Sequence, residues 1–141
     1  MKKFRFVLAA AVLALSATAA SADGRVFFAY LYGGNERPAA GDPDAFGIAT
    51  VTLINAGALC YSIVVNNIVA PTAAHIHAGV AGVVGGVVVP LPIAPLVPAR
   101  MAGCIGAPAA TIAAIKLNPQ NFYVNVHNAA FGAGAVRGQL Q

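Results

Sequence analysis

The side chains best suited to metal or acid–base chemistry are three histidines, the only ones in the 141-residue chain. His75 and His77 lie two residues apart within the short stretch 73–79, and His127 follows about fifty residues later. Side chains alternate between the two faces of a strand, so His75 and His77 are expected on one face and Ile76 on the other.

His127 ends a second strand-like run, which begins at residue 122. Alternation places Tyr123, Asn125 and His127 on one face of this run and Val124 and Val126 on the opposite face. If the valines and Ile76 point into a core, all three histidines point away from it and can converge on the outside of one sheet.

Three imidazoles at one locus suit Zn or Cu, with a fourth position open for water. The sequence leaves two interpretations open, of which the first is preferred: the histidines form a structural hydrogen-bond cluster without any ion, or His75, His77 and His127 bind a metal. Asn125 lies beside His127 and could orient a ring nitrogen, and Tyr123 is a further structural neighbour. No cofactor other than Cu or Zn is indicated.

Other kinds of catalysis have little support. The few carboxylates lie near Glu36 and the Asp42–Asp44 turn, and the serine that follows the leader, Ser62, is not in a G-x-S-x-G motif. The remaining charged residues of interest are Glu36 and Arg137. They either form a surface ion pair between the first loop and the last strand, contributing about 0–1 kcal/mol, or are two unpaired, solvated charges. The leading expectation is therefore a non-enzymatic binding or structural module of unknown ligand, and the alternative is a copper- or zinc-binding protein, similar to superoxide dismutase, that uses the three histidines.

Residues 1–22 have the features of a secretory signal peptide. A basic start is followed by the apolar run 6–15 and by the small-x-small sequence Ala20-Ser21-Ala22, which predicts cleavage before Asp23. The apolar run is too short to span a bilayer, which takes about 20 residues. We therefore expect an exported protein, periplasmic or extracellular, whose mature domain is 23–141 and has no transmembrane segment.

Cleavage also changes the charge balance. The whole chain has net charge +4, but the leader holds three of the eight basic residues, which leaves five basic against four acidic ones. No cluster of Lys and Arg remains to neutralise phosphates, so nucleic acid is excluded as a partner. A protein or small ligand is the expected partner, and the sequence does not identify it.

The chain has two cysteines, Cys60 and Cys104. An even number of cysteines in an exported chain predicts a disulfide, which here would close a loop of about 45 residues and stabilise the fold by about 4 kcal/mol in the chain-entropy model. A reduced, buried pair is the alternative.

The mature chain is predicted to be all-β, an immunoglobulin-like or Greek-key β-sandwich of about eight short strands separated by Gly, Pro and Asn turns. On the third strand, Leu59, Tyr61, Ile63 and Val65 are expected to share one face. The expected strands are Arg25–Tyr32, Gly47–Ile54, Ala58–Asn67, Ala73–Gly79, Gly86–Val89, Thr111–Leu117, Phe122–His127 and Ala135–Leu140.

Two stretches are harder to assign. The alanines of 107–115 favour helix, but the stretch is short and lacks a cap, so its second half is assigned to a strand. The proline-rich stretch 90–98 is expected to be an extended loop, serving either as a crossover between sheets or as a lid over the histidines.

Four sequence blocks together resemble the CHRD domain, the domain named for chordin. They are Leu31-Tyr32-Gly33-Gly34-Asn35-Glu36-Arg37-Pro38, His75-Ile76-His77-Ala78-Gly79, Phe122-Tyr123-Val124-Asn125-Val126-His127-Asn128 and Gly134-Ala135-Val136-Arg137-Gly138-Gln139-Leu140. The last block departs from the usual pattern, because Ala135 stands where the family commonly has an acidic residue.

The resemblance implies an all-β, immunoglobulin-like or Greek-key module outside the cytoplasm, and it carries over no catalytic residue. The positions that match the family pattern are Gly34, Glu36, Pro38, His75, His77, Gly79, Tyr123, Asn125, His127, Arg137 and Gly138. The H-x-H pair is also similar to the copper ligands of Cu,Zn superoxide dismutase, although the further ligands of that family have no counterpart here.

Overall fold

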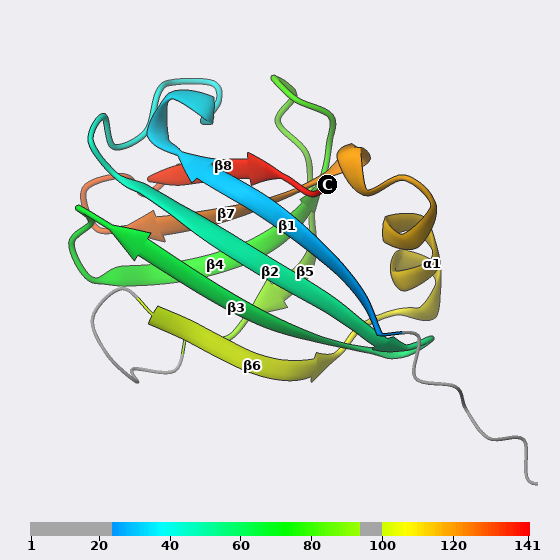
Figure 1. The fold of residues 1–141 in the computed structure, drawn as a ribbon. Helices are drawn as coiled ribbons and strands as arrows, with labels where there is room; N and C mark the ends of the chain where they lie inside the picture. The colour runs from blue at the N-terminus through cyan, green and yellow to red at the C-terminus, as the bar shows by residue number, and fades with distance from the viewer. Residues whose placement is uncertain (1–23, 94–99) are drawn as a thin grey trace, which may run out of the picture.

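The structure is a computed structural model that describes residues 24–93 and 100–141. The predicted leader, 1–22, and most of the proline-rich stretch lie outside this range. In the described part, eight strands form one antiparallel sheet that curls into a nearly closed barrel (Figure 1). Its strand order is β5-β4-β7-β8-β1-β2-β3-β6, with β5 and β6 at the two edges.

The strands and helices follow the chain in a simple order. The strands are β1 (Arg25–Tyr32), β2 (Phe46–Asn55), β3 (Ala58–Asn66), β4 (Pro71–Ala78), β5 (Val87–Leu91), β6 (Arg100–Gly106), β7 (Phe122–Asn128) and β8 (Val136–Gln139). The helices are α1 (Ala109–Leu117) and the 3-10 turns η1 (Gly33–Asn35) and η2 (Pro119–Asn121).

The all-β class and the number of strands are confirmed. The immunoglobulin-like, Greek-key sandwich stays a prediction, since the strands described here belong to a single hydrogen-bonded sheet. The interior is filled by alternate residues of the strands, and the predicted inward face of β3 is correct, because Leu59, Tyr61, Ile63 and Val65 are all buried.

The prediction of a strand at Thr111–Leu117 is wrong, since this stretch belongs to α1. Ile112 and Ile115 are both buried, and their spacing of three residues puts them on one side of the helix, which lies at one end of the barrel (Figure 1). Burial of these two side chains outweighs the missing N-terminal cap, since Pro108 makes no side-chain hydrogen bond there.

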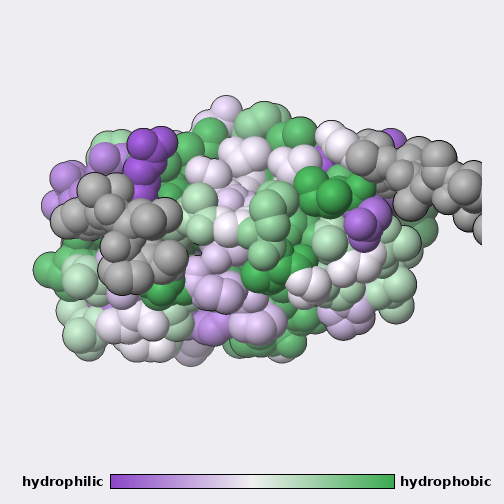
Figure 2. All heavy atoms as spheres, turned by 90° about the horizontal axis from the view of Figure 1, so that it is seen from below, coloured by the Kyte–Doolittle hydropathy of each residue, from purple (hydrophilic) through white to green (hydrophobic). Residues whose placement is uncertain are grey.

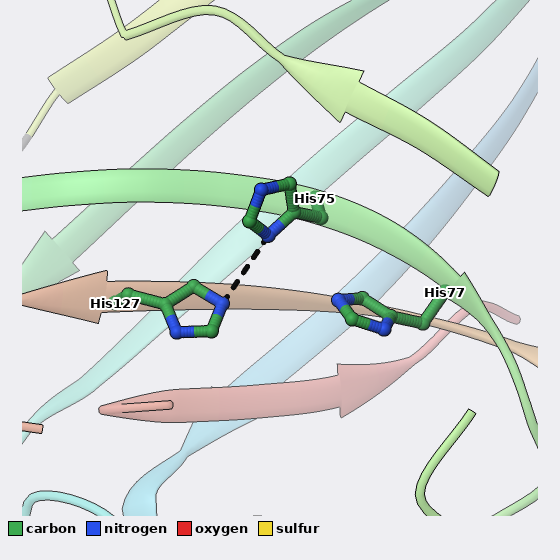
Figure 3. A group of neighbouring side chains, drawn as sticks. All are labelled: His75, His77 and His127. Carbon is green, nitrogen blue, oxygen red and sulfur yellow. Dashed lines mark hydrogen bonds between the residues drawn. The ribbon is translucent and has the colours of Figure 1, made fainter. Parts of the chain in front are cut away.

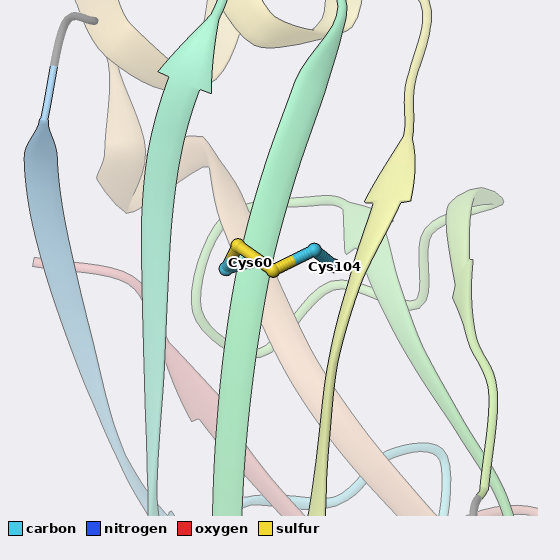
Figure 4. The surroundings of a disulfide bond; sticks show 2 residues. All are labelled: Cys60 and Cys104. Carbon is cyan, nitrogen blue, oxygen red and sulfur yellow. A yellow bond between two sulfur atoms is a disulfide. The ribbon is translucent and has the colours of Figure 1, made fainter.

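The sequence did not indicate β6, which is poor in large residues. Cys104 of β6 lies directly opposite Cys60 of β3, with their Cα atoms 3.9 Å apart, and the two form the predicted disulfide (Figure 4). The disulfide thus ties the edge strand β6 to the neighbouring strand β3.

The surface carries few charges. In the view from below in Figure 2, hydrophobic and near-neutral residues cover most of the face and strongly hydrophilic ones are scattered. Charged residues make up only 9% of the chain. The places where a charged side chain meets a hollow or a buried layer are therefore informative about function.

The disulfide yields the first prediction. Replacing both Cys60 and Cys104 by Ala is expected to lower the free energy of unfolding by about 2–4 kcal/mol, because the open chain gains conformational entropy when unfolded. Urea unfolding with and without a phosphine reductant measures this loss. The reductant should destabilise the wild type and leave the double variant unchanged, and two free thiols in unreduced wild-type protein would contradict the prediction.

Candidate functional site

The three histidines meet on the outer face of β4 and β7 (Figure 3). Ile76, Val124 and Val126 are fully buried in the core beneath them, as strand alternation requires. In the register of β4 and β7, Ile76 pairs with Val124 and Ala73 pairs with His127. His75 and His127 are therefore diagonal neighbours on the outer face of the two strands.

One possible ligand atom from each histidine lies within 4.8 Å of the other two. The shortest approach is between Nδ1 of His75 and Nε2 of His127, which are 3.2 Å apart. Two nitrogen ligands of one tetrahedral Zn ion lie about 3.3–3.4 Å apart, given Zn–N bonds of about 2.0–2.1 Å. One pair is therefore already at ligand spacing, and the third ring needs a movement of about 1–2 Å.

Hydrogen bonds to backbone carbonyls fix the tautomers of two rings. His77 Nδ1 donates to the carbonyl of Gly85 at 2.9 Å, and His127 Nδ1 donates to that of Gly132 at 3.0 Å. Both rings therefore direct an Nε2 lone pair into the cluster, as metal-ligating histidines do. His75 then donates its Nδ1 proton to His127, and this proton has to leave Nδ1 if that atom is to bind an ion.

Two polar atoms of the cluster are buried without a hydrogen-bond partner. They are Nε2 of His77 and Oδ1 of Asn125, which lies opposite His75 in the register of the two strands. Buried polar atoms are nearly always hydrogen-bonded, so each exception calls for an explanation such as an ion or water. Both orphaned atoms can donate an electron pair to a cation.

The electrostatic setting favours neutral rings. Burial lowers the pKa of His75, and the neighbouring His127 and His77 lower it further. Burial also lowers the pKa of His77, although its hydrogen bond to Gly85 opposes this shift. Neutral imidazoles are the form that binds metal ions.

A loop of residues 79–86, here called the covering loop, lies over the same face. Arg137 of β8 donates to the carbonyls of Val83 at 2.8 Å and Val80 at 3.0 Å, and the Tyr123 hydroxyl accepts from the Gly85 amide. Tyr123 also stacks on His77, with ring centroids 4.8 Å apart, and carries the guanidinium carbon of Arg137 3.3 Å from its ring centre. The loop and these side chains form a polar layer outside the sheet.

Glu36 and Arg137 are not at the surface, where the sequence placed them. Each is 2% exposed, and the Arg137 hydrogen bonds go to the covering loop and to Gln139. The Glu36 carboxyl packs against Gly134, where a Cβ atom would overlap it. Burial raises the pKa of Glu36 to about 7, although the charge of Arg137 opposes the shift.

Sequence reasoning missed the covering loop and a neighbouring cavity of about 340 Å³. The cavity lies between β1, β8, the tip of the covering loop and the segment after η1. The run of glycines in 79–86 was the available signal that backbone here packs closely against other groups.

An all-β domain with a polar layer over β4, β7 and β8 is the class of protein that this structure defines. Comparison with known families matches the CHRD domain over residues 27–140, so the chain belongs to the CHRD domain family. The comparisons with curated proteins and with solved structures find no match. No helix in residues 24–93 and 100–141 has the length and apolar character needed to cross a membrane.

The buried Glu36 yields the second prediction. Its pKa is about 7 in the folded protein and near its ordinary value of 4.5 when unfolded, so the folded state holds the proton more tightly. The stabilisation of the folded state by this tightly held proton is present below pH 4.5 and is lost as the pH rises through 7. Glu36→Gln should therefore be more stable than the wild type at pH 8, by about 1–3 kcal/mol, and nearly equal to it at pH 4.5.

Urea unfolding of both proteins at a series of pH values measures this difference. At pH 4.5 the Glu36 carboxyl of the folded wild type is protonated. A difference between the two proteins at this pH therefore measures the effect of replacing the carboxyl group by an amide. A difference between the two proteins that stays constant from pH 4.5 to 8 would contradict the buried, protonated state of Glu36.

Proposed function

We propose that the protein is an exported, non-enzymatic binding module whose ligand is a transition-metal ion, Cu or Zn, held by His75, His77 and His127. The observation that carries the proposal is the buried, unpartnered Nε2 of His77, fixed in its tautomer by Gly85 and facing the other two rings. Three imidazoles form a donor set that both ions accept.

The residues of such a site would have different roles. His77 and His127 are oriented by backbone carbonyls, whereas His75 has to exchange its Nδ1 proton for the ion. Asn125 lies beside the rings as a further oxygen donor or as a hydrogen-bond partner to a water on the ion. A bound ion would supply Lewis acidity and, in the case of Cu, electron transfer.

The competing function is a structural hydrogen-bond cluster, with the module binding an unidentified protein or small molecule elsewhere. The hydrogen bond between His75 and His127 favours this alternative, since it satisfies both nitrogens without an ion. In that case Nε2 of His77 would take its hydrogen bond from the amide of Asn125, the side chain whose hydrogen bonding opposes the lowering of the pKa of His77. Metal analysis separates the two functions.

The third prediction is that the protein exported by its own leader binds about one Cu or Zn ion per chain. An excess of about 100 times the dissociation constant should raise the free energy of unfolding by about 2.7 kcal/mol. Metal content is measured by plasma mass spectrometry and affinity by calorimetric titration. His77→Ala should lose the ion, whereas Asp44→Asn, which removes an exposed carboxylate, should keep it.

Protein that holds no stoichiometric Cu or Zn and takes none up would overturn the metal proposal. If the copper form is obtained, its rate of superoxide dismutation is compared with that of the same copper concentration in solution. A rate no higher than that of free copper leaves a carrier or structural site and excludes the enzyme similar to superoxide dismutase.

We also propose export with cleavage of residues 1–22, which yields the mature domain 23–141 in the periplasm or outside the cell. The disulfide supports this location, since such bonds persist in oxidising compartments. The fourth prediction is that expression of the full chain in a Gram-negative bacterium gives a protein in the periplasm or the medium whose first residue is Asp23. Intact mass measurement decides, and full-length protein in the cytoplasm would contradict export.

A further inference from the structure

The cavity beside the polar layer is large enough for a small molecule. Its volume of about 340 Å³ lies within the range of ligand pockets, about 300–1,000 Å³. It is lined by Tyr30, Tyr32, Asn35, Arg37, Ala81, Gly82, Arg137, Gly138, Gln139 and Gln141. The histidine cluster contributes none of these residues, so the cavity is a separate site.

One wall of the cavity is an aromatic platform. Tyr30 and Tyr32 are alternate residues of β1, point outward and are 54% and 50% exposed. Phe46 of β2, directly opposite Tyr32, is 46% exposed and extends the platform beyond the cavity. Large aromatic side chains left half in water on one face offer flat apolar surfaces for a ligand to stack on.

The rest of the wall is built from planar polar groups. Gln139 is fully used inside the fold, because the two N–H groups of its amide are shared among three backbone carbonyls and its oxygen accepts from Arg137. Asn35 uses its nitrogen on the Arg137 carbonyl, which leaves its oxygen as an acceptor. Gln141 is exposed at the rim, and its amide offers both donors and an acceptor.

The cavity also carries positive charge. Arg37 and Arg137 both line it, and no acidic side chain is among its lining residues in the described ranges. Arg137 is buried and bonded to the covering loop, so it supplies charge at the floor. Arg37 is exposed and is held by one nitrogen, which donates to the carbonyls of Gly34 and Glu36. Its other donors remain for a ligand.

We propose that this cavity binds an acidic saccharide, with the sugar rings on the tyrosine platform and the carboxylate on Arg37. A pyranose ring has a flat C–H face that stacks on an aromatic ring, and its hydroxyls suit the amides of Asn35 and Gln141. A carboxylate matches the paired N–H donors of a guanidinium. On a surface so poor in charge, two arginines without a lining acid select an anion.

The platform is long enough for more than one sugar. Tyr30 and Tyr32 are about 7 Å apart along the strand, given a rise of about 3.4 Å per residue, and Phe28 continues the outward row. A chain of uronate residues can therefore lie along β1 while one carboxylate enters the cavity. This geometry favours an oligosaccharide over a single acidic sugar.

The test is calorimetric titration of metal-free protein, so that its result is independent of the proposed metal site. The probe is an oligogalacturonide, and the comparison ligands are a neutral galactose oligosaccharide of the same length and inorganic sulfate. We expect a dissociation constant of about 1 mM or tighter for the oligogalacturonide, and binding at least about 10-fold weaker for the other two.

Three variants test which side chains bind the oligogalacturonide. Arg37→Gln and Tyr32→Ala should each weaken oligogalacturonide binding by at least about 10-fold, because each removes a charged or stacking contact. Arg100→Gln removes an exposed arginine of the edge strand β6 and is the matched control, expected to bind as the wild type does. Thermal unfolding verifies that all three variants fold.

Four outcomes would overturn the proposal. They are no binding of the oligogalacturonide, equal binding of the neutral oligosaccharide, equal binding of sulfate, and an equal loss in Arg100→Gln. Equal binding of sulfate would identify a site for simple anions, and equal loss in the control would identify nonspecific charge attraction.

Discussion

The buried guanidinium of Arg137 is the interaction on which the outer layer of this domain depends. A charged group removed from water is tolerated only when its N–H groups find acceptors. The acceptors of Arg137 are the carbonyls of Val80 and Val83, together with Gln139. The covering loop must therefore lie over β7 and β8, and it hides the outward faces of strands that would otherwise meet solvent.

This cover makes β7 a strand that is buried on both sides. Its inward residues Val124 and Val126 pack in the apolar core, while its outward residues Tyr123 and Asn125 lie in the polar layer. A polar layer within a small domain is costly wherever an atom lacks a partner. The unpartnered atoms of His77 and Asn125 belong to the histidine cluster, and a third, Nδ2 of Asn128, lies at the end of β7, so this cost falls at both places.

The sequence predicted the strands that bury large alternating residues and failed where other forces decide. Along β3, alternation alone identified the inward face. The helix α1 was assigned to a strand because its short sequence suits both structures, and the burial of Ile112 and Ile115 on one side decides between them. The strand β6 has too few large residues to show an alternating pattern. Its pairing with β3, in which Cys104 lies opposite Cys60, depends on a contact between distant parts of the sequence.

For the site, the same alternation predicted which histidines share a face, since that follows from local geometry. It did not predict what covers them, because the hydrogen bonds that bury Arg137 join it to residues 54 and 57 positions earlier in the sequence, which alternation along one strand does not indicate. Gly85 shows why the cover lies so close, since a Cβ atom there would overlap the carbonyl of Ala78. Close approach of this backbone lets the Gly85 carbonyl accept from His77 while the Gly85 amide donates to Tyr123, so a residue without a side chain sets the tautomer of His77.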